Sequence, residues 1–173
     1  ELGVFGEPQN SEAAEAWRLR AAEAGDVDQQ WTQASRLLRE GNGHAPDYRA
    51  ALPWLEKAAA QDHREALIRL GRILRDGSAG PVDDTRARAL FLRAVALGYP
   101  NASVYAAHML HSGRGGPRDS QRAMELLRQS ASDENAWVLF HLGQAVREGW
   151  AAAPDLDAGQ KIWERAAELG STN

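Results

Sequence analysis

A fixed internal period of 36 residues runs through most of this 173-residue chain. Glycine recurs at that spacing, and an aspartate follows each of these glycines by six residues. The glycines are Gly41, Gly77, Gly113 and Gly149, and the aspartates are Asp47, Asp83, Asp119 and Asp155. Such a period is typical of stacked copies of one small unit, because a single unit cannot bury its own apolar face. The period therefore predicts a repeat solenoid.

Each unit is predicted to contain two helices joined by a turn. In one copy, Leu67, Leu70 and Leu74 recur at the spacing of an amphipathic helix. Gly77 is expected to end this helix with a positive φ, as Gly113 should one unit later. The aspartate six residues after each glycine is well placed to cap the second helix through its carboxylate.

The second helix that carries Pro53 is an exception to this regular pattern. Because proline lacks a backbone N–H, we expect that helix to begin late, between Ala50 and Pro53, or to bend there. The register also predicts the core. The residues expected to be buried are Leu70, Leu74, Leu90, Phe91 and Val95. Trp54 and Trp163 should be largely buried.

The predicted fold is all-α, a right-handed α/α superhelical solenoid of about four to five 36-residue helix-turn-helix repeats. It forms one domain over residues 1–173. We expect a partial repeat over 1–26, followed by repeats at about 27–62, 63–98, 99–134 and 135–170. Small residues that recur at facing positions, such as Gly71 and Ala87, should let the two helices of a unit approach closely.

One unit also matches a known consensus residue by residue. The matching residues are Ala66, Leu70, Gly71, Leu74, Gly77, Asp83, Ala87, Leu90, Arg93, Ala94 and Gly98. Over residues ~10 to 170 this pattern resembles the Sel1-like repeat (SLR) family, which is related to the tetratricopeptide (TPR) repeats. The resemblance implies a superhelix whose first helices line a concave face, and an adaptor role. The cysteine pairs of one Helicobacter subfamily are missing.

Composition excludes several classes of function. There is no cysteine, so thiolate metal sites and thiol nucleophiles are impossible. The net charge of −4 and the pI of about 5.7 argue against a general nucleic-acid binder. No apolar run in the sequence approaches the ~20 residues that span a bilayer. The chain starts at Glu1, so we expect a processed protein or an excised fragment, with any signal peptide or lipid anchor upstream.

We find no catalytic motif and expect no cofactor. The glycine-rich stretch 113–116 falls at an inter-helix turn of the repeat, so its position argues against a phosphate loop. His108, His111 and His141 could share a metal ion, but three histidines without a neighbouring carboxylate are weak evidence, and we expect no metal site. His44 and His63 are expected to be solvated.

A polar and aromatic stripe on the first helices is the best candidate for a binding surface. Arg, Tyr and Trp are enriched at binding hot spots, and Arg grips carboxylates well. The chain holds 18 Arg and 2 Lys. The candidate partner-binding residues are Gln33, Arg36, Arg69, Arg72, Tyr105, His108, Trp137, His141 and Gln144.

We therefore interpret the chain as a non-catalytic scaffold that binds another protein on its concave face, in a bacterial envelope or secretion-related complex. Three alternatives stay open: an immunity-type inhibitor of a secreted toxin, a module for envelope polysaccharide or peptidoglycan, and a hydrolase. The glycan alternative rests on Tyr105, Trp137 and Trp150. The Ala- and Arg-rich composition indicates a bacterial genome, and we expect a periplasmic or otherwise extracytoplasmic protein, with the cytoplasm as the other possibility.

Overall fold

The computed structural model describes residues 8–39, 45–132 and 135–170, with the side chains of 8–12 left aside. Within those ranges the chain forms nine α-helices and no strand. The helices are α1 (Pro8–Glu23), α2 (Val27–Leu37), α3 (Tyr48–Ala60), α4 (Arg64–Asp76), α5 (Asp84–Ala96), α6 (Pro100–Ser112), α7 (Ser120–Ser130), α8 (Ala136–Glu148) and α9 (Leu156–Gly170).

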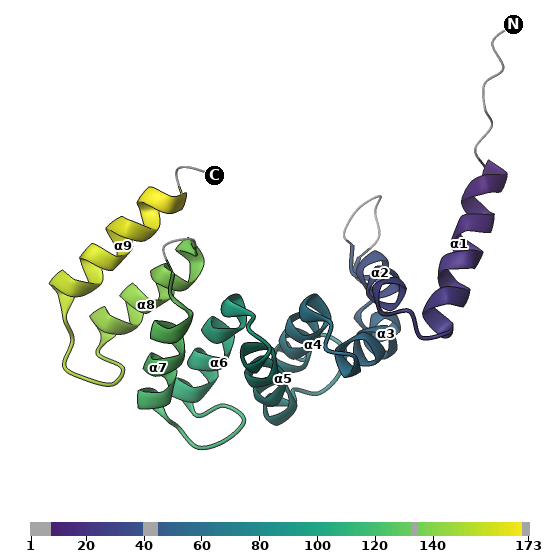
Figure 1. Ribbon diagram of the computed structural model, residues 1–173. Coiled ribbons are helices and arrows are strands. Elements are labelled where there is room, and N and C mark those ends of the chain that lie inside the picture. Colours follow the sequence, from purple (N-terminus) through teal and green to yellow (C-terminus); the bar gives the residue numbers. More distant parts are fainter. Residues whose placement is uncertain (1–7, 40–44, 133–134, 171–173) are drawn as a thin grey trace, which may run out of the picture.

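The helices pair in chain order and stack into an arc (Figure 1). Each helix packs against the next one along the chain, so the pairs α2–α3, α4–α5, α6–α7 and α8–α9 follow one another. Helices α2, α4, α6 and α8 are called the first helices below, and α3, α5, α7 and α9 the second helices. The all-α repeat solenoid predicted from the period is confirmed.

The capping residues act where the repeat predicts them. The carboxylates of Asp47, Asp83, Asp119 and Asp155 each accept the backbone N–H three residues later, at 2.8–2.9 Å. These bonds satisfy N–H groups that a helix start leaves without a partner. Gly77 and Gly113 end α4 and α6 with φ of 70° and 75°, as expected.

The late start expected for the helix that contains Pro53 is wrong. Helix α3 begins at Tyr48, and Pro53 lies inside it. The Asp47 cap and the complete burial of Ala51 and Leu55 stabilise the first turns. That stabilisation outweighs the one backbone hydrogen bond that proline removes.

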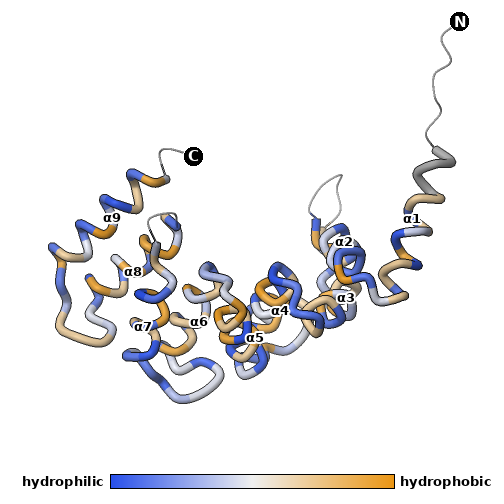
Figure 2. The backbone as a smooth tube through the Cα atoms, viewed as in Figure 1, coloured by the Kyte–Doolittle hydropathy of each residue, from blue (hydrophilic) through white to orange (hydrophobic). Residues whose placement is uncertain are grey.

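The core runs along the solenoid between first and second helices. Leu70, Leu74 and Phe91 are buried as predicted, and Figure 2 shows hydrophilic and hydrophobic stretches alternating along the helices. Leu90, Val95, Trp54 and Trp163 are only half-buried. The first three of these pack against the rim of the core, because each second helix has one side toward solvent.

Small residues are required where paired helices touch. A Cβ added at Gly71 would lie 2.7 Å from Cε1 of Phe91 on α5, and one at Gly143 would lie 2.5 Å from Cδ1 of Trp163 on α9. Real Cβ contacts are essentially never that short. The recurring small residue therefore sets how closely the helices of a unit approach.

Candidate functional site

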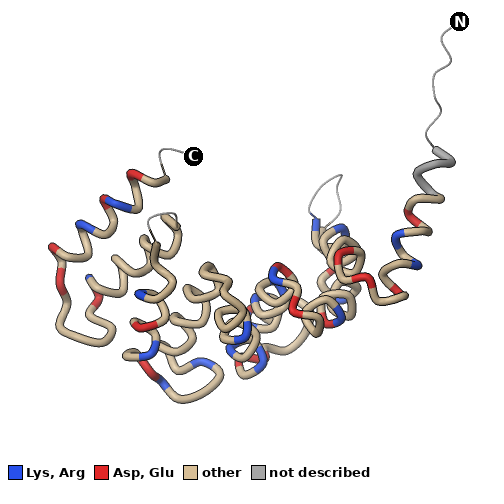
Figure 3. Tube along the Cα trace, in the orientation of Figure 1, with Lys and Arg blue, Asp and Glu red and all other residues tan. Residues whose placement is uncertain are grey.

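The nine candidate residues lie on the four first helices, and the charge on these helices is uneven. Figure 3 shows Arg, Asp and Glu along α4, whereas α6 carries no Arg, Lys, Asp or Glu. The candidate residues therefore form a charged part on α2 and α4, and an aromatic and histidine-rich part on α6 and α8.

Gln33 and Arg36 of α2 face helix α1. The Arg36 guanidinium forms an ion pair with Glu15. Both α2 residues line a cavity of about 760 Å³ together with Leu19 and Trp54. These two candidates are therefore separated from those on α4.

Arg69 and Arg72 of α4 border a different pocket, between α2 and α4. Its volume is about 360 Å³, and its apolar lining comes from Trp31, Leu38 and Ile68. Both arginines are half-buried, and within the described part of the chain neither forms an ion pair. Two positively charged side chains therefore border an apolar pocket.

Tyr105 connects the charged part to the aromatic part. Its ring stacks on Phe91, with centroids 5.0 Å apart and an angle of 20° between the planes. The guanidinium carbons of Arg72 and Arg75 lie 6.0 and 5.6 Å from its ring centre, within cation–π range. The structure therefore brings Tyr105 and Arg72 together.

Histidine and tryptophan side chains form a second cluster where α6 meets α8. Nε2 of His108 lies 3.3 Å from Nδ1 of His141. The His141 ring meets Trp137 edge to face at 4.3 Å, and Trp137 is 47% exposed. Gln144 donates to Glu148 at 2.9 Å, so it lies at the edge of this cluster.

Burial and neighbouring charges shift the pKa values in this cluster. Burial lowers the pKa of His108 and of His141, and each is lowered further by another histidine. Burial likewise lowers the pKa of His111. Hydrogen bonds from Gln144 and Trp150 lower the pKa of Glu148. Near neutral pH the cluster therefore holds uncharged imidazoles beside one carboxylate.

The isolated histidines differ from expectation. His63 is not solvated: its side chain is 14% exposed, it caps α4 by accepting the N–H of Ala66, and its ring stacks on Trp31. Its place between two units explains the burial. His44 lies outside the described residues. In the described ranges, no group of three or more His, Asp or Glu side chains is placed to hold a metal ion.

Sequence reasoning missed how two tryptophans shape the surface, because it named Trp150 only for glycan binding and did not name Trp31. Trp150 is 7% exposed, its ring stacks on His111 at 4.1 Å, and His108 meets it edge to face. A signal was available, because Ser78 and Arg114 hold the equivalent turn position in other units. A tryptophan that departs from the repeat at a turn indicates a local role.

Among the helices of the described ranges, none combines the length and the apolar character that a bilayer span requires.

Solved structures share this fold. A Sel1 repeat protein from Oxalobacter formigenes superposes with a TM-score of 0.80 at 23% identity, over 92% of this chain and 65% of its own. A protective antigen of uropathogenic Escherichia coli with an SLR fold gives 0.76 at 26% identity, over 91% of this chain and 33% of its own. Cysteine-rich protein B of Helicobacter pylori gives 0.51 at 14% identity, over 74% of this chain and 91% of its own. The chain thus spans less than two thirds of the first two proteins.

Sequence comparison gives the family directly. No curated protein matches the chain. The family model for the Sel1 repeat matches residues 1–26, 34–63, 64–99, 100–135 and 139–171. Sel1-repeat proteins are generally protein-interaction scaffolds, and the fold is typically a non-catalytic interaction module. With these five matches across nearly its whole length, the chain belongs to the Sel1 repeat family.

Proposed function

We propose that this chain is a non-catalytic scaffold that binds a partner protein across its first helices, on the concave side of the arc. A continuous run of side chains carries the proposal. Arg72 lies over Tyr105, His108 follows one turn along α6, and His141 connects His108 to Trp137. Arginine and aromatic side chains contribute most to binding in protein interfaces.

The setting we propose is a bacterial envelope or secretion-related complex outside the cytoplasm. Three solved relatives come from bacteria, and one is a protective antigen of a uropathogen. An immunity-type inhibitor that grips a secreted toxin would use the same surface and is the narrower form of the proposal. Fractionation of cells that express the intact gene tests the compartment.

The glycan alternative has less support from the side chains. Sugars stack on exposed aromatic faces, but Trp150 is 7% exposed with His111 stacked on it, and Tyr105 is stacked on Phe91. Of the three aromatic residues proposed for glycan binding, only Trp137 is largely exposed. The hydrolase alternative also has little support. Oγ of Ser120 lies 3.0 Å from Nδ1 of His111, but in the described residues no carboxylate pairs with the His111 ring to orient it as a base.

The test is binding of the physiological partner, isolated by affinity purification from the source organism. Alanine at Arg72, Tyr105 or His141 should weaken binding by about thirtyfold or more if these residues are hot spots. Arg49→Ala is the matched control, because Arg49 is exposed on a second helix and has no ion pair in the described part of the chain. Wild-type affinity in all three first-helix variants would contradict the proposal.

A further inference from the structure

Neighbouring first helices meet at three seams, α2–α4, α4–α6 and α6–α8. Arg69, Tyr105 and His141 are equivalent residues of three consecutive repeats, spaced by 36 residues. Arg69 projects into the α2–α4 seam, Tyr105 into the α4–α6 seam and His141 into the α6–α8 seam. Tyr105 packs on Phe91, and His141 packs among His108, Trp137 and Phe140. Two seams are therefore filled by a ring of the chain itself, whereas the first seam has an arginine there.

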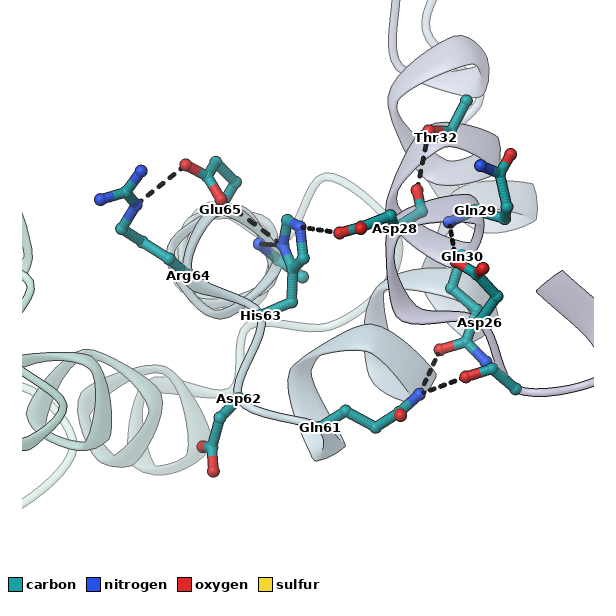
Figure 4. A network of polar contacts seen from close by, with 12 residues as sticks. Asp26, Asp28, Gln29, Gln30, Thr32, Gln61, Asp62, His63, Arg64 and Glu65 are labelled. Carbon is teal, nitrogen blue, oxygen red and sulfur yellow. Dashed lines mark hydrogen bonds and ion pairs between the residues drawn. The ribbon is translucent and has the colours of Figure 1, made fainter. Parts of the chain in front are cut away.

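The first seam is the one that holds the pocket of about 360 Å³ lined by Trp31, Leu38 and Ile68. Its walls are fixed in place. The Trp31 ring stacks on His63, with centroids 5.3 Å apart, and the Gln61 side chain donates to Gly25 and Gln30, which ties α3 to the start of α2. Figure 4 shows His63 between α2 and α4, with the hydrogen bonds of Gln61 drawn below it.

Three positive charges surround this apolar floor: Arg39, Arg69 and Arg72. In the part of the chain that the structure describes, none of the three has an ion-pair partner, whereas neighbouring Arg36, Arg64 and Arg75 each have one. The lining carboxylate, Glu65, already accepts from Arg64 at 2.9 Å. The pocket of this acidic protein is therefore locally positive.

The next seam shows how such a position is filled. In the α4–α6 seam, the Tyr105 ring lies 5.6 Å from the guanidinium of Arg75. Arg39 is the residue equivalent to Arg75 one repeat earlier, and it borders the pocket in the first seam. A ring supplied from outside would thus meet the same cation–π partner.

We propose that the pocket bordered by Arg39, Arg69 and Arg72 binds an extended segment of the partner protein in which a bulky apolar or aromatic side chain is flanked by Asp or Glu. The apolar side chain fills the seam as Tyr105 fills the next one. The carboxylates pair with the three arginines, whose planar heads suit bidentate contacts. This inference rests on the proposed function and specifies the chemistry of the ligand.

The experiment is a selection of random phage-displayed peptides on the immobilised full chain, followed by affinity measurements with the selected peptides. Enriched sequences should place Asp or Glu within two residues of Phe, Tyr, Trp or Leu. The double variant Arg69→Gln, Arg72→Gln should bind them at least about tenfold more weakly. The double variant Arg18→Gln, Arg49→Gln makes the same charge change on α1 and α3, away from the pocket, and should bind like wild type.

Specific outcomes overturn the inference. It fails if no peptide is enriched on wild type, if the enriched peptides lack acidic residues, or if they bind the Arg69–Arg72 variant as tightly as wild type with its unfolding midpoint unchanged. If it fails while Tyr105→Ala and His141→Ala still weaken binding of the physiological partner, the scaffold function stands and only the ligand class is wrong. If that partner also ignores both substitutions, the proposed function fails as well.

Discussion

Nε2 of His108 lies 3.3 Å from Nδ1 of His141, and this pair joins the first helices α6 and α8. One imidazole must donate and the other accept, so the accepting ring has to be neutral. Protonation of both rings would replace a hydrogen bond with repulsion between two cations. The seam between the last two repeats therefore depends on the charge of its histidines.

Stability should fall as the solution is acidified. Burial lowers the folded-state pKa of His108, His111 and His141. A histidine with a lowered folded pKa contributes stability that is fully present above its unfolded pKa of ~6.5 and is lost as pH falls through the lower folded value. Glu148, whose pKa is also lowered, loses its contribution only further down, from ~4.3. The urea midpoint should drop between pH 7.5 and pH 5.

The double variant His108→Gln, His141→Gln tests whether this pair is responsible. Glutamine keeps hydrogen-bonding capacity but does not titrate, so the variant should lose much of the fall in midpoint over the same pH range. An unchanged pH dependence in this variant would show that other groups control acid sensitivity.

Leu70 should be a major source of stability. It is 2% exposed on α4, in the middle of the stack. Leu70→Ala removes buried methyl groups and leaves a cavity, which together cost roughly 2–5 kcal/mol. Leu97→Ala is the control, because Leu97 is 41% exposed and its truncation should change stability little. Equal effects of the two substitutions on the free energy of unfolding would contradict the assigned core.

The helix caps should contribute measurably. The Asp119 carboxylate accepts the N–H of Arg122 at 2.8 Å at the start of α7. Asp119→Ala leaves this N–H without its partner and should cost about 0.5–2 kcal/mol, whereas Asp119→Asn retains an acceptor and should cost less. Chemical unfolding of both variants measures the difference, and alanine no worse than asparagine would argue against the cap.

The repeat explains what the sequence could predict. Gly77 and Gly113 end their helices in the same left-handed conformation, and the four capping aspartates accept the same backbone N–H, so their recurrence shows their role. The first-helix core is also predictable, because Leu74 is buried as its repeat equivalents Leu38 and Leu110 are. Helix propensity alone misjudged the start of α3, because the cap and the buried residues Ala51 and Leu55 offset Pro53.

The candidate surface was less predictable, because it depends on where the units differ. A column of equivalent positions suggests one stripe, yet Arg36 pairs with Glu15 of α1 while Arg72 lies over Tyr105. These partners come from other helices, and neither periodicity nor residue type gives their distance. The contacts of Trp150 with His108 and His111 were indicated only by its departure from the repeat.

Two glycines with positive φ should respond differently to alanine. Gly115 has φ of 75°, and a Cβ there would lie 2.2 Å from the backbone oxygen of Asp84 in the previous unit. Gly98 has φ of 80°, but a Cβ there would meet nothing within 4 Å.

Both substitutions incur the left-handed penalty of roughly 1–2 kcal/mol. Only Gly115→Ala must also move the turn away from α5, a steric cost of about 1–3 kcal/mol more. That movement would strain the contact in which Arg114 binds the carboxylate of Asp84, with Nε at 3.0 Å. Thermal unfolding of the two variants side by side measures the difference, and a Gly98→Ala protein as destabilised as Gly115→Ala would show that backbone conformation, not contact between units, requires glycine at residue 115.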